Sequence, residues 1–118
     1  MNHQEIWETY AASWRATDAA EKMALFAQCL DADCQYQDPL ATARGWEELT
    51  AYMLEFHRQI PGGHFVTTEF LTHNNKSVAR WEMRDNKDAV LGTGISYGEY
   101  TESGRLHQMT GFYPLPQA

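Results

Sequence analysis

The chain has 118 residues and a formal net charge of -7, with 9 basic and 16 acidic side chains. Its length fits a single domain over residues 1–118, and its hydrophobic content of 43% excludes a disordered protein. The acidic balance argues against nucleic acid or an anionic membrane as a partner, and no apolar run reaches the roughly 20 residues of a membrane span.

The first half of the chain predicts three helices, over residues 3–16, 18–31 and 46–60. In each of them, apolar side chains recur at the three- and four-residue spacing of one helical face. Asp18 and Glu21 have the spacing of a capping box, which begins the second helix. The apolar faces comprise Ile6, Trp7, Tyr10, Ala11 and Trp14, then Met23, Phe26, Ala27 and Leu30, and then Trp46, Leu49, Met53, Phe56 and Ile60.

A short extended segment at residues 34–38 separates the second helix from the third and ends at Pro39. After Pro61-Gly62-Gly63 the apolar period changes from helical to alternating, which predicts strands. These strands cover residues 64–73, 77–84, 89–100 and 105–113. Helices followed by a strand meander indicate an α+β fold, in which three N-terminal helices pack on a curved, mainly antiparallel sheet that forms a cone-shaped half-barrel.

One predicted strand carries small residues on a single face, at Gly92, Gly94, Ser96 and Gly98. Because bulky helix residues lie opposite, this face predicts a hollow that holds a small apolar molecule. The alternative is that the aromatic side chains simply fill the space. The residues expected to line the hollow are Trp14, Phe26, Phe56, Trp81, Met83, Met109 and Tyr113.

Several segments together resemble the nuclear-transport-factor-2-like superfamily. They are Tyr10 to Trp14, Tyr36 to Pro39, Arg44-Gly45 before a helix, Ser103 to Leu106 and Thr110 to Tyr113. The nearest similarity is to the SnoaL-like polyketide cyclase branch and the ketosteroid isomerases. The resemblance implies a cofactor-free isomerase or cyclase, although the same fold also hosts transport factors and binding domains.

Asp38 is the first candidate catalytic residue. A carboxylate that ends a strand beside an apolar hollow is partly desolvated, and this favours proton uptake. In the isomerases that this sequence resembles, the aspartate of the matching Asp-Pro pair is the general base. The alternative interpretation is that Asp38 caps the turn after its strand and faces solvent.

Three further residues are candidates for the same chemistry. Tyr10 matches the tyrosine that donates a hydrogen bond to the oxyanion in ketosteroid isomerases, or else it is a core tyrosine with its hydroxyl at the rim. Ser96 stands where those isomerases carry a protonated aspartate, and this departure argues against steroid isomerase activity. His107 shares strand parity with Met109 and Tyr113, so we expect it at one end of the hollow as an acid or base, or as a polar rim group.

The remaining polar residues do not predict a metal or cofactor site. The histidines lack ligand spacing, and the chain has no phosphate loop and no nucleophile elbow. Cys29 and Cys34 fit neither a zinc nor a redox spacing, and the N-terminus lacks signal-peptide features, so we expect buried or idle thiols in a reducing cytoplasm.

The other face of the sheet predicts an interface. Its apolar residues Ile95, Tyr97, Leu106 and Phe112 are expected among charged neighbours of both signs. Members of the superfamily that the chain resembles often dimerise through this face, so we expect a homodimer. Two functions remain open, a proton-transferring enzyme and a non-catalytic binding or regulatory domain.

Overall fold

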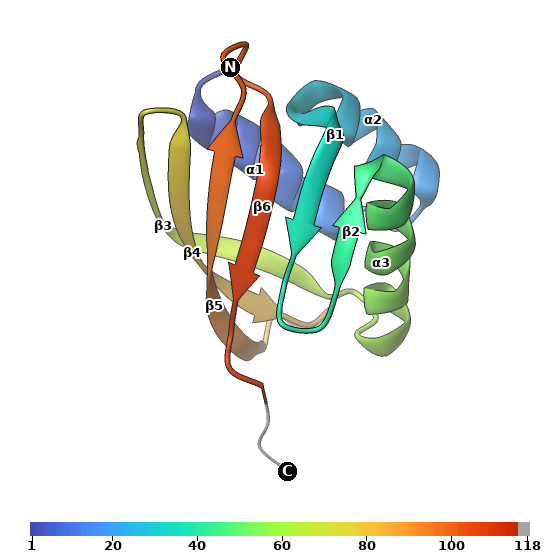
Figure 1. Cartoon of the computed structure of the whole chain (residues 1–118). Helices are drawn as coiled ribbons and strands as arrows, with labels where there is room; N and C mark the ends of the chain where they lie inside the picture. Colours follow the sequence, from blue (N-terminus) through green and yellow to red (C-terminus); the bar gives the residue numbers. More distant parts are fainter. Residues whose placement is uncertain (116–118) are drawn as a thin grey trace.

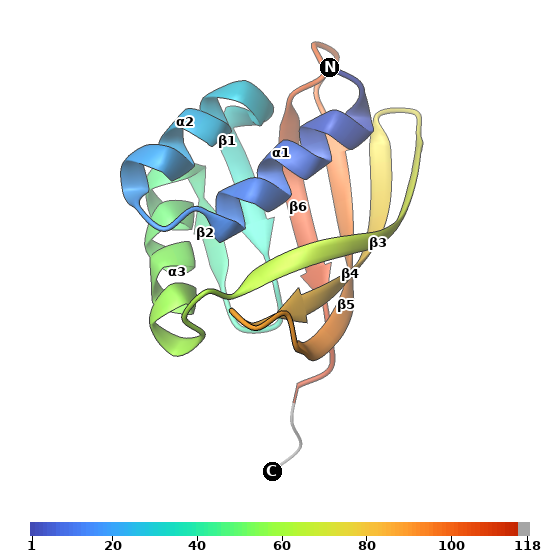
Figure 2. The ribbon, with the colours of Figure 1, turned by 180° about the vertical axis from the view of Figure 1, so that it is seen from behind.

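The computed structural model describes residues 1–115. The helices and strands, in chain order, are α1 (His3–Arg15), α2 (Ala19–Cys29), β1 (Leu30–Gln37), β2 (Thr42–Arg44), α3 (Gly45–Gln59), β3 (His64–His73), β4 (Lys76–Arg84), β5 (Val90–Tyr100) and β6 (Leu106–Phe112). Three helices pack on one face of a six-stranded curved sheet, and the opposite face is in front in Figure 1. In Figure 2, α1 crosses the inner face of the sheet, while α2 and α3 lie beside β1 and β2. This arrangement confirms the predicted α+β fold.

Local side-chain bonds determine where the first two helices begin. Asn2 and Glu5 form a reciprocal capping box at the start of α1, and Asp18 accepts a hydrogen bond from the backbone N–H of Glu21 at the start of α2. The helix α2 ends two residues earlier than predicted, because Leu30 already belongs to β1.

A buried lysine ties the helices together. The Nζ atom of Lys22 donates to the carbonyl oxygens of Ser13 (2.8 Å) and Ala16 (2.7 Å) at the end of α1, and lies 3.0 Å from Nε2 of His57 on α3. These bonds satisfy carbonyl groups that the last turn of a helix leaves without partners. Burial lowers the pKa of Lys22 to about 8.

The strand order is β2-β1-β6-β5-β4-β3. All neighbouring pairs are antiparallel except β1 and β6, which are parallel. The strand β1 begins four residues earlier than the predicted extended segment, and β2, which the sequence did not predict, pairs with its end. The two strands are joined by a tight turn, in which the N–H of Asp38 donates to the carbonyl of Ala41 (3.0 Å).

A bulge in β6 corrects two predictions about that strand. Glu99 pairs with Gln108, but the next residue, Tyr100, pairs with Leu106, so His107 is an extra residue in β6. Strict alternation therefore fails here. Leu106, which was expected on the outer face, is fully buried in the core, and the parity that grouped His107 with Met109 does not hold.

The two cysteines lie in the core and are not joined by a disulfide. Burial raises the pKa of Cys29 to about 12 and that of Cys34 to about 11, so both are protonated thiols at neutral pH. Across residues 1–115, no helix combines the length and the apolar character that a membrane crossing requires.

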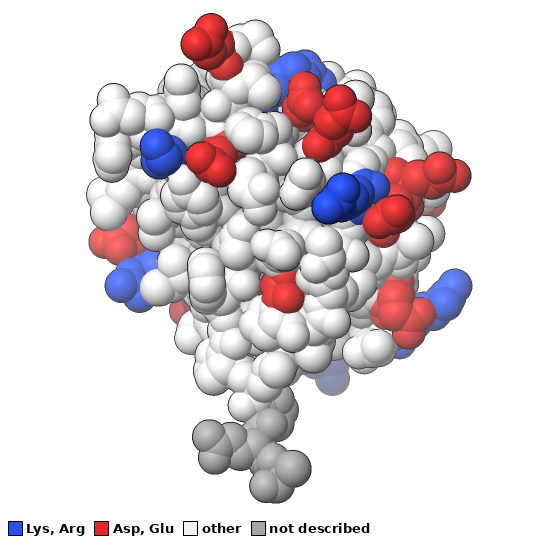
Figure 3. Space-filling model, in the orientation of Figure 1, with Lys and Arg blue, Asp and Glu red and all other residues white. Residues whose placement is uncertain are grey.

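The outer face of the sheet carries an apolar stripe across three strands. Val78 on β4 is opposite Tyr97 on β5, and Ile95 on β5 is opposite Phe112 on β6. The exposed fractions of Val78 and Phe112 are 40% and 59%, which is large for such residues. In Figure 3 this face is largely uncharged over β5 and β6, with charged groups of both signs around it.

Candidate functional site

A cavity of about 680 Å³ lies between the inner face of the sheet and the helices. This volume is within the range typical of small-molecule sites. Helices α1 and α3 and strands β1, β3, β4, β5 and β6 all contribute lining residues, and the segment after β6 adds Tyr113 and Pro114. The aromatic residues in the lining are Trp7, Tyr10, Trp14, Tyr36, Tyr52, Phe56, Phe65, Trp81 and Tyr113.

The carboxylate of Asp38 is half-buried at the edge of this cavity and accepts four hydrogen bonds. Oδ2 accepts from the hydroxyls of Tyr36 (2.5 Å) and Tyr52 (2.7 Å). Oδ1 accepts from the backbone N–H groups of Leu40 (2.8 Å) and Ala41 (3.0 Å), which is the pattern of an Asx turn. One oxygen therefore caps the turn, and the other is bonded within the tyrosine cluster of the cavity.

Sequence reasoning missed both tyrosine partners of Asp38. Burial raises the pKa of Tyr36 and of Tyr52, so both stay protonated and act as donors to the carboxylate. The sequence positions of both tyrosines indicated that they lie near the cavity. Tyr36 lies two residues before Asp38 and so shares its side of the strand, and Tyr52 lies between Leu49 and Phe56 on the apolar face of α3.

Tyr10 and Ser96 also line the cavity. Burial raises the pKa of Tyr10, which keeps it a neutral phenol. The hydroxyl oxygen of Ser96 accepts a hydrogen bond from Nε1 of Trp81 (2.9 Å). A Cβ atom at Gly111 would stand 3.6 Å from Oγ of Ser96 and 3.7 Å from Cβ of Asp38, so only glycine backbone lies between these two side chains.

The glycine face of β5 differs in part from the prediction. A Cβ atom at Gly94 would stand 2.3 Å from Cζ2 of Trp81, and one at Gly98 would stand 3.2 Å from Cζ3 of Trp7. Tryptophan rings therefore pack against these two positions, where open space was expected. At Gly92 no described atom beyond its two chain neighbours lies within 4 Å of such a Cβ atom, so the cavity is open at that end of the strand.

Five of the seven residues expected to line the cavity do so, namely Trp14, Phe56, Trp81, Met83 and Tyr113. The other two, Phe26 and Met109, belong to the core and are almost completely buried. Phe26 faces Trp46 on α3, with 6.0 Å between ring centroids, because α2 packs on α3 as well as on the sheet. His107 is likewise absent from the lining, which follows from its place in the β6 bulge.

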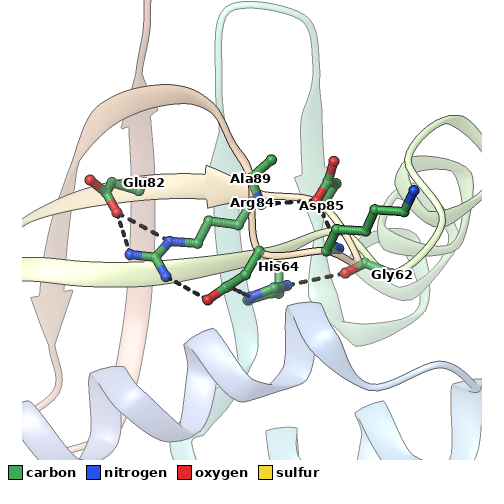
Figure 4. Close-up of polar contacts among 8 residues, drawn as sticks. Gly62, His64, Glu82, Arg84, Asp85 and Ala89 are labelled. Atoms are coloured by element: carbon green, nitrogen blue, oxygen red, sulfur yellow. Dashed lines mark hydrogen bonds and ion pairs between the residues drawn. The ribbon is translucent and has the colours of Figure 1, made fainter.

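A second hollow, of about 470 Å³, is polar and lies where β3 begins. Figure 4 shows the network around it. Arg84 donates to Glu82 (2.6 Å) and to Asp88 (3.0 Å), and Asp88 also faces Nε2 of His64 (3.2 Å). The other ring nitrogen of His64 is 3.1 Å from the carbonyl oxygen of Gly62. The network joins β3 to the turn between β4 and β5.

Comparison with known families agrees with this architecture. Residues 7–109 match the family described as SnoaL-like domain. The chain belongs to the SnoaL-like family. Through it, the chain is a member of the nuclear-transport-factor-2-like superfamily. A search of curated proteins finds no significant match to the sequence.

Solved structures share the fold. A candidate isomerase of the SnoaL-like family from Agrobacterium tumefaciens is 24% identical, with a TM-score of 0.87 and coverage of 96% of this chain and 97% of that one. A candidate polyketide cyclase from Sinorhizobium meliloti is 10% identical, with a TM-score of 0.73 and coverage of 94% and 99%. A protein from Catenulispora acidiphila with a ketosteroid isomerase-like fold, in complex with trimethylamine, is 18% identical, with a TM-score of 0.72 and coverage of 94% and 86%.

Proposed function

We propose that this SnoaL-like protein is a cofactor-free cytoplasmic isomerase or cyclase that moves a proton next to a carbonyl group in a largely apolar substrate. The observation that carries the proposal is that Asp38 and Ser96 lie on either side of Gly111, which has no side chain, in an aromatic cavity. A base that faces the carbon next to a carbonyl and a hydroxyl donor that faces the carbonyl oxygen suit proton abstraction with polarisation of the carbonyl.

In the proposed reaction, Oδ2 of Asp38 takes a proton from the carbon next to the carbonyl. The electron pair of the broken C–H bond moves into the carbon–carbon bond, and the carbonyl oxygen becomes an enolate oxygen. Asp38 then returns the proton to another carbon of the substrate, so that atoms and charge balance. Because Nε1 of Trp81 donates to Oγ of Ser96, the serine hydroxyl keeps its own proton to donate to the enolate oxygen.

The tyrosines give this site a means of responding to proton transfer. When Asp38 is ionised, its oxygen accepts hydrogen bonds from the hydroxyls of both Tyr36 and Tyr52. When that oxygen is protonated, it donates a hydrogen bond itself. Proton uptake by Asp38 therefore releases a tyrosine hydroxyl toward the substrate. Tyr10, a neutral phenol in the same lining, is a further donor for the developing charge.

The second candidate function is a non-catalytic ligand-binding domain. It is favoured by the four hydrogen bonds that Asp38 already accepts and by a serine in place of the isomerases' acid. The trimethylamine complex of the Catenulispora acidiphila protein supports a binding role for a domain of this fold.

Asp38→Asn distinguishes the two functions. Asparagine keeps the shape of the side chain but cannot take up a proton at neutral pH. We expect the wild-type protein to accelerate deuterium exchange next to the carbonyl of cyclohexenone in D₂O, and the variant to lose about 10²-fold or more of that rate. Proton NMR measures the exchange, and tryptophan fluorescence measures binding of the ketone.

Asp33→Asn is the matched control, since Asp33 is an exposed aspartate on the same strand. It should exchange the ketone protons at the wild-type rate. Equal rates for wild type, Asp38→Asn and Asp33→Asn would remove Asp38 as the base and leave the binding domain as the better reading.

We further propose that two copies of the chain pair through the outer face of the sheet. The support is the stripe of Val78, Ile95, Tyr97 and Phe112, whose exposed apolar surface is edged by ion pairs such as Arg80 with Glu69 (3.1 Å).

A further inference from the structure

The charges that line the cavity all have one sign. Among residues 1–115, the ionisable acids and bases in the lining other than tyrosine are Asp38 and Glu55, and no lysine, arginine or histidine of this range contributes to it. Glu55 is half-exposed and forms an ion pair with Arg58 (2.9 Å). Asp38 is different, because its four hydrogen-bond donors are all neutral and no cation of residues 1–115 lies within ion-pair distance. The carboxylate therefore contributes a net negative charge that no protein group in its contact shell cancels.

The aromatic rings of the lining also favour a positively charged ligand. Phe65 stands nearly perpendicular to Trp81 (85°) and to Trp14 (76°), and Phe56 is nearly perpendicular to Trp14 (86°). These pairs meet edge to face, and Phe56 lies stacked on Phe65 (25°), so the four rings form one packed aromatic wall of the cavity. Since the face of an aromatic ring carries the negative part of its quadrupole, a cation held against such faces is attracted to them.

The hydrogen bonds of Asp38 restrict the kind of cation. Each carboxylate oxygen already accepts two hydrogen bonds, so a ligand with several N–H donors would find few acceptors at this end of the cavity. A primary ammonium group would lose its hydration without replacement. An alkylated ammonium spreads its charge over methyl or methylene groups and needs few acceptors.

We propose that the cavity selects ligands that carry an alkylated ammonium group, held against the rings of Trp14, Phe65 and Trp81 with its charge toward Asp38. This inference rests on the proposed function only in using the same cavity as the ligand site, and it names the class of molecule that the cavity prefers. A negatively charged ligand is excluded from the cavity by the same carboxylate.

The test compares three probes of similar size by isothermal titration calorimetry. They are choline, its neutral carbon isostere 3,3-dimethylbutan-1-ol, and ethanolamine, which carries a primary ammonium. We expect choline to bind about tenfold more tightly than the neutral isostere, which is within the usual strength of cation–π attraction in a desolvated site. Ethanolamine should bind more weakly than choline.

Two variants identify the source of the preference. Asp38→Asn removes the negative charge, and Phe65→Leu removes one aromatic wall while keeping an apolar side chain. Each should lower the affinity for choline severalfold and leave the affinity for the neutral isostere nearly unchanged. Asp33→Asn, on the exposed side of β1, should bind all three probes as the wild type does.

Equal or tighter binding of the neutral isostere would overturn the inference, and so would the failure of choline to bind at millimolar concentration. The result is separate from the ketone exchange experiment. Exchange without a preference for choline would refute the ligand class alone, whereas a preference for choline without exchange would refute proton transfer alone.

Discussion

Replacing Gly94 with alanine is expected to destabilise the protein by about 1–3 kcal/mol, the usual cost of overpacking a filled site. The new Cβ atom would stand 2.3 Å from Cζ2 of Trp81 and 2.7 Å from the backbone oxygen of Phe112. The indole ring can turn away only by giving up its bond to Ser96 (2.9 Å), and the backbone oxygen is fixed by the pairing of β5 with β6. Neither contact can relax freely.

Thermal unfolding followed by tryptophan fluorescence measures this effect. For a domain of this size, 1 kcal/mol corresponds to a Tm change of roughly 3–6 °C. Gly92→Ala is the matched control, because Gly92 lies two residues earlier on the same face with nothing within 4 Å of its would-be Cβ atom. We expect its Tm to stay the same or rise slightly, since glycine in a strand costs about 0.5–1 kcal/mol relative to alanine. Equal Tm values for the two variants would refute the packing of Trp81 on Gly94.

Two further predictions concern stability and assembly. Burial and the neighbouring charge of Lys22 lower the pKa of His57 in the folded protein. Below pH 6.5, the ordinary pKa of histidine, the unfolded chain therefore binds more protons than the folded one, and the free energy of unfolding falls as the pH decreases. His57→Gln should lose less stability than the wild type between pH 7 and pH 5 in urea unfolding, and equal losses would contradict this assignment. Phe112→Glu should weaken the proposed dimer by burying an unpaired charge. Sedimentation of the wild type as a monomer at about tens of micromolar, well above the Kd of a stable dimer, would remove its premise.

The order and type of the elements could be read from the sequence because the apolar period changes clearly after Pro61-Gly62-Gly63. The short strand β2 could not be predicted, since three residues are too few for a period to appear. The bulge at His107 was also hidden, because alternation counts residues and cannot register an extra one. That single insertion explains why the expected positions of both Leu106 and His107 were wrong.

The site was harder to predict than the fold. Asp38 could be singled out from its place beside Pro39, but its tyrosine partners depend on how α3 packs against β1, which no local pattern encodes. The small residues of β5 indicated a hollow. Only tertiary packing decides that tryptophan rings occupy Gly94 and Gly98 while Gly92 remains open.

The parallel pairing of β1 with β6 has a consequence for the order in which the chain folds. Each of the other four strand pairs joins strands that follow one another in the chain, and such hairpins can form on their own. The pairing of Tyr36 with Met109 instead brings together segments that are far apart in the sequence. The entropy cost of closing its loop is therefore the largest among the five strand pairs. We therefore expect this seam to close late in folding and to open early in unfolding. Because Asp38 and Gly111 lie on either side of it, a ligand that touches both would hold the seam shut and slow unfolding.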